Sequence, residues 1–447
     1  MSNEKHNRDR VPHEIDQEDP FWEDEPKPPR LALRTKMGGV TACWIATMLL
    51  VGAWNLAPKE RVPGTPDLTL PEENEIDRGP DEETTVVVPN TTHQDEGPTQ
   101  NLIEDSQNNS RDTETLLTTN LGEPDGQPAL WHKVYTNLKP HAIIGSGDGG
   151  FIIAGEMGGD IFALRIDRGG NKSWQRTYGG GYSDFANDLC LSGDGGFVVV
   201  GATCSNSSCK VADKGVVLRM DKNGTLLWET RLDGKARYVA PCSDGGYLIT
   251  GDHLVKIDAS GSLLWTKDFG PSGHIIPADQ GNNFIFNIPG DSLAKIDSGG
   301  EVIWRDELRA NTTVRMITRT SDGGYAAAGY SQGHTYLLRI DANGRRVWDR
   351  IYAGNYSEWA YSICQTEDGG FITTGSTCSC GSGWYDVHVL KVDSDGDLVW
   401  HRVYGGSDID TGWDMVTAGE NRYIIAADTD SFGSQYVTDL YILCVEG

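Results

Sequence analysis

The sequence predicts an all-β fold: a seven-bladed β-propeller that is closed by an N-terminal strand. Three observations predict it. The pattern Asp-x-x-Gly-x-x-x-Trp recurs six times, with its tryptophans at Trp174, Trp228, Trp265, Trp304, Trp348 and Trp400. A second pattern, Asp-Gly-Gly-aromatic, alternates with it at Asp148, Asp194, Asp244, Asp322 and Asp368, with degraded copies that end in Phe284 and Tyr423. The aromatics of this second pattern are 46, 50, 37, 41, 46 and 52 residues apart, which suits a four-stranded blade and is too long for a leucine-rich repeat.

Each repeat unit is expected to hold four strands. In the first unit these are residues 141–146 for the inner strand, 151–155 and 161–167 for the next two, and the segment around Trp174 for the outer strand. Asp-Gly-Gly supplies the positive-φ residues that a tight hairpin needs, and the Asp-x-x-Gly turn does the same. The tryptophan is expected to pack between blades, where a buried ring is worth roughly 3 kcal/mol or more. The repeated Asp, Gly and Trp residues are therefore predicted to be structural.

The two ends of the repeat region complement each other. The segment Ala129–Tyr135 matches an outer tryptophan strand but follows no blade, whereas the last unit stops after its third strand, Asp439–Val445. If the early segment completes the last blade, the ring closes and no sheet edge is exposed between the ends. We therefore expect seven complete blades within residues 128–447.

The repeat resembles a known propeller family. The tryptophan pattern, with fuller units such as Asp368–Gly375 followed by Asp386–Gly406, is similar to the tryptophan-docking repeats of propellers related to pyrroloquinoline quinone enzymes and of surface-exposed propeller proteins of archaea and bacteria. The resemblance covers residues 130–447 and implies the fold. Quinone-dependent dehydrogenases of this kind have eight blades, adjacent cysteines and calcium, and this sequence has no Cys-Cys dipeptide. Non-enzymatic members, including a lipoprotein that assists outer-membrane assembly, share the motif without a cofactor.

The residues before the propeller predict a membrane anchor. Residues 37–57 carry no charge and as a helix would be roughly 30 Å long, enough to cross a bilayer. We favour an uncleaved signal anchor over a cleaved signal peptide or a buried core helix. Basic residues precede it, which predicts a disordered cytoplasmic tail over residues 1–36 and an extracellular propeller at the cell membrane. Residues 58–127 are acidic and almost free of aromatics, and they predict a disordered extracytoplasmic stalk.

Charge and cysteine content are consistent with a surface location. A net charge of −27 argues against nucleic acid as a partner. Eight cysteines fall in the predicted propeller, which allows disulfides: Cys204 with Cys209 closes the shortest loop, and longer-range partners are expected for Cys378 and Cys380. Zinc is disfavoured because histidine is scarce and no C-x-x-C pair occurs. Glycosylation sequons beyond the anchor suggest a glycoprotein; they lie at Asn90, Asn108, Asn171, Asn206, Asn223, Asn311 and Asn355.

One acidic turn has a spacing of carboxylates that suggests a calcium site. Asp393, Asp395 and Asp397 alternate, as calcium ligands can, but no bidentate glutamate follows them. Other repeats have Asn-Gly or Ser-Gly turns at this position, so a turn is the preferred interpretation. No cofactor is predicted, and calcium is the alternative.

Long loops mark the candidate site. The two hairpins of every repeat are short, whereas the opposite face carries paired long loops in the second, sixth and seventh repeats. Exposed aromatics beside acids are suited to sugar, peptide or cation recognition, and function commonly lies in variable loops on a rigid scaffold. The structural alternative is that the loops cover one another and their aromatics wedge between blades. The candidate binding residues are Tyr182, Asp184, Tyr356, Glu358, Trp359, Trp384, Tyr385, Asp386, Asp408, Asp410 and Trp413.

Two functions of different class follow. The first is a membrane-anchored extracellular propeller that binds or scaffolds a surface glycan, peptide or protein. The alternative is an enzyme, either a quinone-dependent oxidoreductase or a hydrolase of surface polymers, with Asp184, Glu358 and Asp410 as candidate acids. The sequence holds no nucleophile elbow, phosphate loop or helical metal motif. Because fold analogy does not establish function, the binding module is preferred only as a hypothesis.

Overall fold

A computed structural model describes residues 100–102, 117–179, 183–204, 214–279, 282–288, 292–433 and 437–447. They belong to one compact unit, Glu96–Gly447. The predicted tail, the predicted anchor and most of the predicted stalk lie outside the described residues. Within the described ranges, no helix is long and apolar enough to span a membrane.

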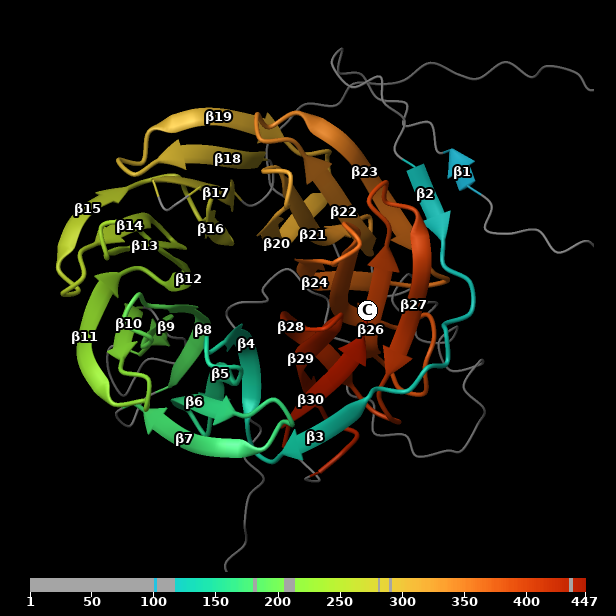
Figure 1. Ribbon diagram of the computed structural model, residues 1–447, viewed down its shortest axis with the longest axis horizontal. Helices are drawn as coiled ribbons and strands as arrows, with labels where there is room; N and C mark the ends of the chain where they lie inside the picture. The colour runs from blue at the N-terminus through green and yellow to red at the C-terminus, as the bar shows by residue number, and fades with distance from the viewer. Residues whose placement is uncertain are drawn as a thin grey trace, which may run out of the picture. The chain divides into compact units, whose positions relative to one another are not determined.

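Seven blades, each of four antiparallel strands, are arranged in a ring with one edge of each blade toward the centre (Figure 1), and the sheet of blade 5 carries two further strands. This confirms the predicted all-β, seven-bladed propeller. Blades 1 to 3 comprise β4 (Lys139–Gly145), β5 (Phe151–Met157), β6 (Asp160–Ile166) and β7 (Lys172–Tyr178); β8 (Asp184–Leu191), β9 (Phe197–Thr203), β10 (Lys214–Met220) and β11 (Leu226–Asp233); and β12 (Ala236–Pro241), β13 (Tyr247–Gly251), β14 (Leu254–Ile257) and β15 (Leu263–Lys267). In the first blade, all four strands occupy the predicted segments to within a few residues.

Blades 4 to 6 repeat the same order from the centre outward. They comprise β16 (Ile275–Pro277), β17 (Asn283–Ile288), β18 (Ser292–Asp297) and β19 (Val302–Glu307); β20 (Thr312–Arg319), β21 (Tyr325–Ser331), β22 (His334–Ile340) and β23 (Arg346–Ala353); and β24 (Glu358–Gln365), β25 (Phe371–Thr377), β26 (Asp386–Val392) and β27 (Leu398–Tyr404). The apolar cores lie between neighbouring sheets, as in the cluster that joins Phe197 and Val199 of blade 2 to Ile152 and Ala154 of blade 1.

Blade 7 joins the two ends of the repeat region. Its inner three strands are β28 (Asp410–Gly419), β29 (Arg422–Thr429) and β30 (Asp439–Glu446), and its outer strand is β3 (Trp131–Tyr135). β3 pairs antiparallel with β30, with Trp131 opposite Cys444 and Tyr135 opposite Leu440. The predicted closure is therefore confirmed, and hydrogen bonds between strands hold the ring shut.

In every blade except blade 6, the tryptophan of the outer strand docks on the glycine of the next blade's Asp-x-x-Gly turn. Gly344 has φ +82°, and a Cβ placed on it would lie 2.8 Å from the Trp304 ring. Only glycine satisfies both conditions, because other residues disfavour positive φ and their side chains would displace the indole. The same contact occurs at six of the seven blade junctions; the pairs are Trp131–Gly170, Trp174–Gly224, Trp228–Gly261, Trp265–Gly300, Trp304–Gly344 and Trp348–Gly396. The structural role predicted for these residues is confirmed.

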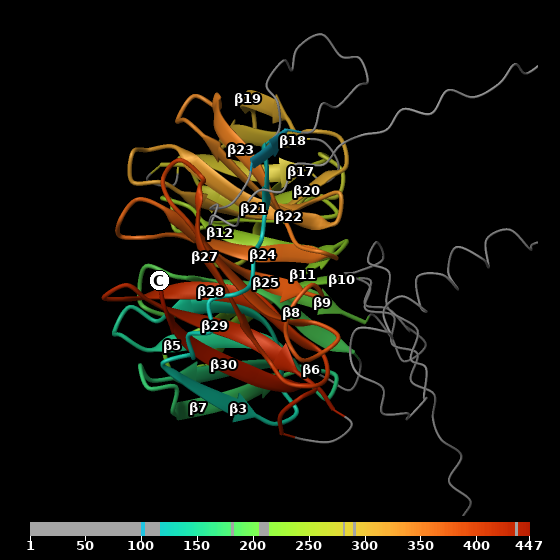
Figure 2. The same ribbon diagram turned by 90° about the vertical axis from the view of Figure 1, so that its right-hand side faces the viewer.

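A strap, residues 117–130, runs along the outside of blades 5 and 6 before it enters blade 7. It begins with β2 (Leu117–Asn120), which pairs parallel with the outer strand β23, and β1 (Gln100–Leu102) pairs antiparallel with β2. The Arg402 guanidinium contacts Asp125 at 3.1 Å as the strap passes blade 6. Figures 1 and 2 show this segment on the outer wall of the ring.

The strap corrects the predicted stalk boundary. Residues 117–127 were expected to be disordered, yet β2 is an ordered strand and Thr118 and Thr119 are buried. The physical reason is that β23 leaves an open row of backbone hydrogen-bonding groups, which a short extended segment satisfies. The ordered region therefore begins ahead of the predicted residue 128.

A β-bulge interrupts six of the seven inner strands at an equivalent position. In blade 2, the bulge lets Asn187 donate to the Ala236 carbonyl of blade 3 at 2.8 Å, while the next residue, Asp188, accepts the Val239 amide at 2.9 Å. In blade 7, Asp414 likewise accepts the Ile143 amide of blade 1 at 2.8 Å. The bulges therefore aim side chains at the neighbouring blade and link the inner strands around the ring.

Candidate functional site

The long loops of blades 2, 6 and 7 pair as the structural alternative predicts. In each blade, the residue after the second strand donates its amide to the loop before the inner strand. The three bonds are Cys204 to the Ser183 carbonyl at 3.1 Å, Cys378 to Ser357 at 3.0 Å and Asp430 to Ile409 at 2.8 Å. The loops therefore cover one another.

Three candidate acids occupy one repeated position. Asp184, Glu358 and Asp410 are the first residues of the inner strands β8, β24 and β28. All three are buried, and Glu358 and Asp410 are 0 % exposed. They were predicted to lie in the long loops, whereas the structure places them in the inner strands, beneath the paired loops.

The hydrogen bonds of these acids show what they do. Glu358 accepts the Gly354 amide at 2.9 Å and the Ser379 hydroxyl. Asp410 accepts the Gly406 amide at 2.8 Å and the Ser431 hydroxyl at 2.7 Å. Each carboxylate thus joins the two long loops of its own blade.

Asp386 forms a like-charge pair at the junction of blades 6 and 7. It is buried at the start of β26 and accepts the Gly383 amide at 3.0 Å. Burial raises the pKa of Asp386 to about 6, and the negative charge of Asp410 adds to the shift. Gly405 lies against both carboxylates, so that any side chain there would collide with them. Asp386 therefore supports the loops from below and does not face solvent.

The exposed candidates gather over blades 6 and 7. In the loops of blade 6, Trp384 is 56 % and Tyr356 is 39 % exposed. Asp408, in the loop that leads into blade 7, is also exposed. The same loops expose three apolar residues that the sequence analysis did not select: Ile409, Phe432 and Val437. We call Tyr356, Trp384, Ile409, Phe432 and Val437 the blade 6–7 patch. Their only sequence signal is that they occur in long loops.

Backbone contacts hold the loops of the blade 6–7 patch together. Tyr385 and Ile409 form a parallel β-bridge, and the Trp384 amide donates to the Asp408 carbonyl at 3.3 Å. Tyr385 also packs on Trp359 with 5.5 Å between ring centroids, and both rings are half-buried. These two aromatics therefore support the patch from beneath.

Of the two remaining candidates, Trp413 does not join the patch. Trp413 lies in the bulge of the inner strand β28 and packs on Tyr361 of blade 6, with 5.0 Å between ring centroids. Tyr182 lies outside the described residues.

The acidic turn considered as a calcium site has the same geometry as the Asp-x-x-Gly turns of the other repeats. Asp393 accepts the amides of Asp395 and Asp397 at 2.9 Å each, and Asp341 accepts those of Asn343 and Arg345 in the same way. Among the side chains that the structure describes, no group of three His, Cys, Asp or Glu residues is arranged to hold a metal.

Cys204 is disulfide-bonded, and its proposed partner Cys209 lies outside the described residues. The other described cysteines are thiols; they are Cys190, Cys242, Cys364, Cys378, Cys380 and Cys444. The longer-range disulfides expected for Cys378 and Cys380 are therefore not formed in this structure.

Comparison with known proteins supports the repeat type. A family model described as outer membrane protein assembly factor BamB matches residues 213–361, which run from blade 2 to blade 6. The repeats are propeller repeats of the pyrroloquinoline quinone type. A crystal structure of a protein of unknown function from Bacteroides caccae is 16 % identical, covering 48 % of this chain and 83 % of that chain with a TM-score of 0.38. No curated protein matches the sequence.

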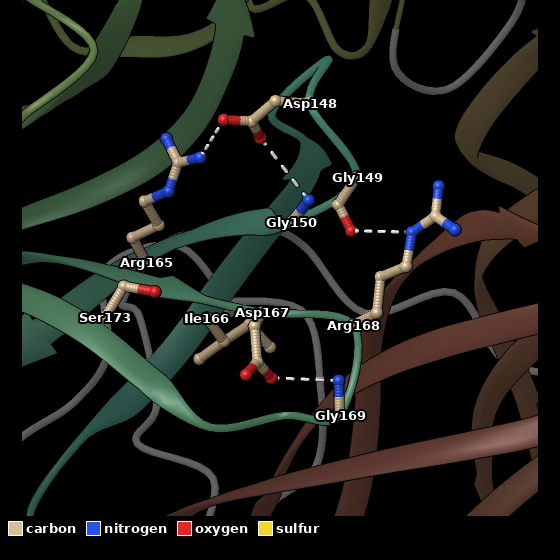
Figure 3. Close-up of a pocket in the computed structure, with 9 residues that line it drawn as sticks. All are labelled: Asp148, Gly149, Gly150, Arg165, Ile166, Asp167, Arg168, Gly169 and Ser173. Carbon is tan, nitrogen blue, oxygen red and sulfur yellow. Dashed lines mark hydrogen bonds and ion pairs between the residues drawn. The ribbon is translucent and has the colours of Figure 1, made fainter.

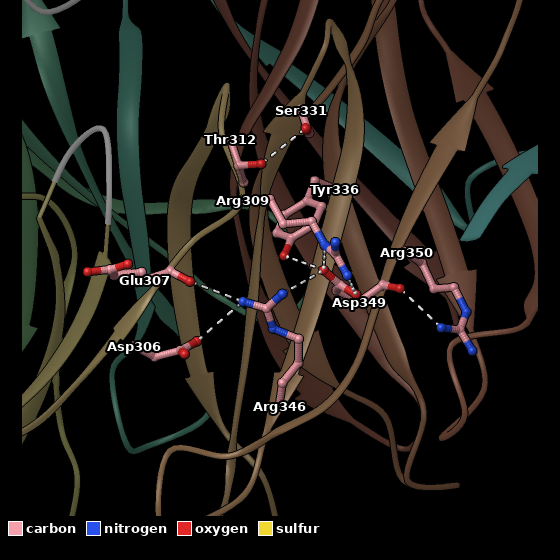
Figure 4. Close-up of polar contacts among 9 residues, drawn as sticks. All are labelled: Asp306, Glu307, Arg309, Thr312, Ser331, Tyr336, Arg346, Asp349 and Arg350. Atoms are coloured by element: carbon pink, nitrogen blue, oxygen red, sulfur yellow. Dashed lines mark hydrogen bonds and ion pairs between the residues drawn. The ribbon is translucent and has the colours of Figure 1, made fainter. Parts of the chain in front are cut away.

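Within the matched quinone-type repeats, a buried ion cluster joins blades 4 and 5 (Figure 4). Asp349 on β23 is buried. Two guanidiniums contact its carboxylate, that of Arg309 at 2.6 Å and that of Arg346 at 3.3 Å. The Tyr336 hydroxyl donates to the same carboxylate at 3.1 Å. Burial raises the pKa of Tyr336 far above its ordinary value, and the negative charge of Asp349 adds to this shift. The Arg346 guanidinium also lies 3.6 Å from the Asp306 carboxylate of blade 4. Each of these charges therefore has a partner of opposite sign, and the cluster is structural.

A depression of about 380 Å³ lies between the two turns of the first quinone-type repeat, on the face opposite the long loops (Figure 3). Its walls are the hairpin turn Asp148–Gly150 and the segment from Arg165 to Gly169, with Ser173 at one side. Hydrogen bonds from Ser146 and Arg165 lower the pKa of Asp148 to about 2. No candidate residue was predicted here, because both turns have a structural role in every repeat.

Proposed function

We propose that this protein is a membrane-anchored extracellular propeller that binds a protein partner through the blade 6–7 patch. The main support for this proposal is that exposed aromatic and aliphatic side chains occur together in the loops of two adjacent blades. Exposed apolar groups of this kind, when polar residues surround them, are typical of protein-interaction sites. Trp and Tyr are also the side chains most enriched among those that dominate binding energy.

Charge indicates what kind of partner segment fits. Asp408 and Asp430 are both exposed next to Ile409 and Phe432 along the loops. Acidic residues around an apolar centre favour a partner that presents Lys or Arg around an apolar anchor, because such complementarity steers and orients association.

The support beneath the patch favours binding without reorganisation. The Tyr385–Ile409 bridge and the carboxylates of Asp386 and Asp410 hold the loops from below. Loops that are ordered before binding lose less entropy when the partner docks.

Two further observations support the proposal. The matched family is described as an assembly factor, which is a protein-scaffolding role. The uncharged segment 37–57, with basic residues ahead of it, supports anchoring with the propeller outside the cell.

Site-specific photo-crosslinking in intact cells tests the proposal. A photoreactive amino acid replaces Trp384 in the full-length chain, and in a matched control it replaces Ala342, which is exposed in a turn of blade 5. The expected result is a protease-sensitive adduct from position 384 and none from position 342. Charge reversal by Asp408→Lys should reduce the yield from position 384 by roughly tenfold, in line with the loss of a favourable charge contact.

Equal adducts from both positions, or none from position 384, would show that the patch is not a partner site. An adduct that resists protease but is removed by periodate would identify a glycan and reject the protein partner.

A further inference from the structure

The first blade departs from the repeat at two positions that line one depression. Arg168 follows the turn aspartate, where the other repeats have Lys222, Ala259, Ser298, Ala342 and Ser394. Ser173 precedes the tryptophan, where the others have aliphatic residues: Leu227, Leu264, Ile303, Val347 and Val399. Both Arg168 and Ser173 line the depression of about 380 Å³ (Figure 3), a volume within the roughly 300–1,000 Å³ of small-ligand pockets.

The other arginine in the depression has a repeated structural role. Arg165 pairs with Asp148, the aspartate of its own Asp-Gly-Gly turn. The same pair recurs in other blades, with contacts of 2.7–2.9 Å; the pairs are Lys256–Asp244, Arg339–Asp322 and Lys391–Asp368. The distinctive chemistry of the first blade therefore comes from Arg168 and Ser173.

These two side chains present free hydrogen-bonding capacity. The Arg168 Nε donates to the Gly149 carbonyl at 3.2 Å, and among the described residues its two terminal nitrogens have no hydrogen-bond partner. The exposed Ser173 hydroxyl likewise has none within the described part of the chain. Asp167 directly precedes Arg168 and also lines the depression, and its Oδ2 accepts one bond, from the Asn171 side chain at 3.1 Å. The depression thus offers a planar cation, a hydroxyl and a carboxylate.

We propose that the depression binds a sugar acid. The Arg168 guanidinium would take the ligand's carboxylate in a two-point contact, which lysine cannot reproduce at the matching position in blade 2. Ser173 and the open side of Asp167 would hydrogen-bond the ring hydroxyls. This site lies on the face opposite the blade 6–7 patch and does not depend on it.

Saturation-transfer NMR with the detergent-solubilised full-length chain tests the site. The probes are glucuronate, glucose, which lacks the carboxylate, and acetate, which lacks the hydroxyls. Glucuronate should bind measurably more tightly than either. Arg168→Ala should weaken glucuronate binding by about tenfold or more, the usual consequence of losing a charge-assisted hydrogen bond. Ser173→Leu, which installs the side chain of the neighbouring repeats, should block binding.

The matched control is Lys222→Ala, which removes the cation from the equivalent turn of blade 2 and should leave the affinity unchanged. Circular dichroism melting of all three variants should match the parent, because the altered side chains are exposed. Acetate or glucose binding as tightly as glucuronate, an unchanged affinity in Arg168→Ala, or an equal loss in Lys222→Ala would each overturn the proposal.

Discussion

Glycines at the turn tips serve two different purposes, although their φ angles are alike. Gly344 and Gly369 have φ +82° and +86°. A Cβ on Gly344 would meet the Trp304 ring at 2.8 Å, whereas a Cβ on Gly369 would meet nothing within 4 Å. One glycine therefore receives a tryptophan from the neighbouring blade, and the other only permits a hairpin.

This difference gives a prediction with an internal control. Gly369→Ala should cost about 1–2 kcal/mol, the ordinary penalty of a left-handed conformation. Gly344→Ala should cost clearly more, because the Trp304 indole must also shift. Urea unfolding of both variants measures the difference. Equal losses of unfolding free energy would show that the docking of Trp304 is not sensitive to this contact.

Partly buried carboxyls on the inner strands make stability depend on pH. Burial raises the pKa of Asp188 to about 7, and the charge of Asp414 adds to the shift. In the unfolded chain the same carboxyl titrates at about 3.9. Because the folded protein holds the proton more tightly, stability falls as pH rises from about 4 to about 7 and stays low above that.

Asp188→Asn removes this dependence while keeping an oxygen for the Val239 amide, which Asp188 accepts at 2.9 Å. The variant should match the parent near pH 4 and exceed it by on the order of 1–3 kcal/mol at pH 8. Thermal melts across this range provide the measurement. A variant that is less stable at pH 8 would mean that the charge of Asp188 has a partner in the folded ring.

Residue type indicated the candidate acids but not their surroundings. Asp184, Glu358 and Asp410 are candidates because acids beside aromatics suit recognition, yet all three are buried, and Glu358 and Asp410 accept amides of the loops above them. Sequence alone does not show that the first residue of an inner strand lies beneath two paired loops. Trp384, Tyr356 and Asp408, which lie in the same loops, are exposed.

At the scale of elements, turn chemistry was the most informative signal. Even the degraded hairpin before Tyr423 keeps the required backbone, since Glu420 and Asn421 take φ of +54° and +55° without glycine. The strap was missed because β2 has four residues, belongs to no repeat and depends on a distant partner, β23. The inner-strand bulges were missed for a similar reason, because they are defined by register between strands.

The strap yields a prediction about the edge that it covers. Thr119→Pro removes a backbone amide from β2, opposite Tyr352 in the parallel register. Hydrogen exchange should then become faster along β23 but stay unchanged in β27, whose edge β2 does not cover. Unchanged exchange in β23 would show that β2 contributes no protection.

At the scale of the whole molecule, the seven blades follow from the repeat count, and closure follows from the unmatched ends. Both predictions are confirmed. They were possible because each sheet of a ring packs against two neighbouring sheets, so few arrangements of the repeats can close the ring. Partner and ligand could not be predicted in the same way, because loop contacts between blades carry no periodic signal.

Truncation tests closure directly. A chain that begins at residue 128 retains β3 and should fold into a monomer that unfolds cooperatively. A chain that begins at residue 137 lacks β3 and exposes β30, so we expect aggregation and a broad transition at lower temperature. Size-exclusion chromatography and calorimetry distinguish the two. Identical behaviour would indicate that blade 7 is stable with three strands.

The strap also determines how a mechanical pull reaches the ring. Tension applied to the chain ahead of residue 117 first meets the pairing of β2 with β23, then the contact between Asp125 and Arg402, and only afterwards the pairing of β3 with β30. Three sequential attachments on three blades would have to yield before the ring opened. A chain pulled from its N-terminal side would thus shed its outer fastenings while its folded head stayed intact.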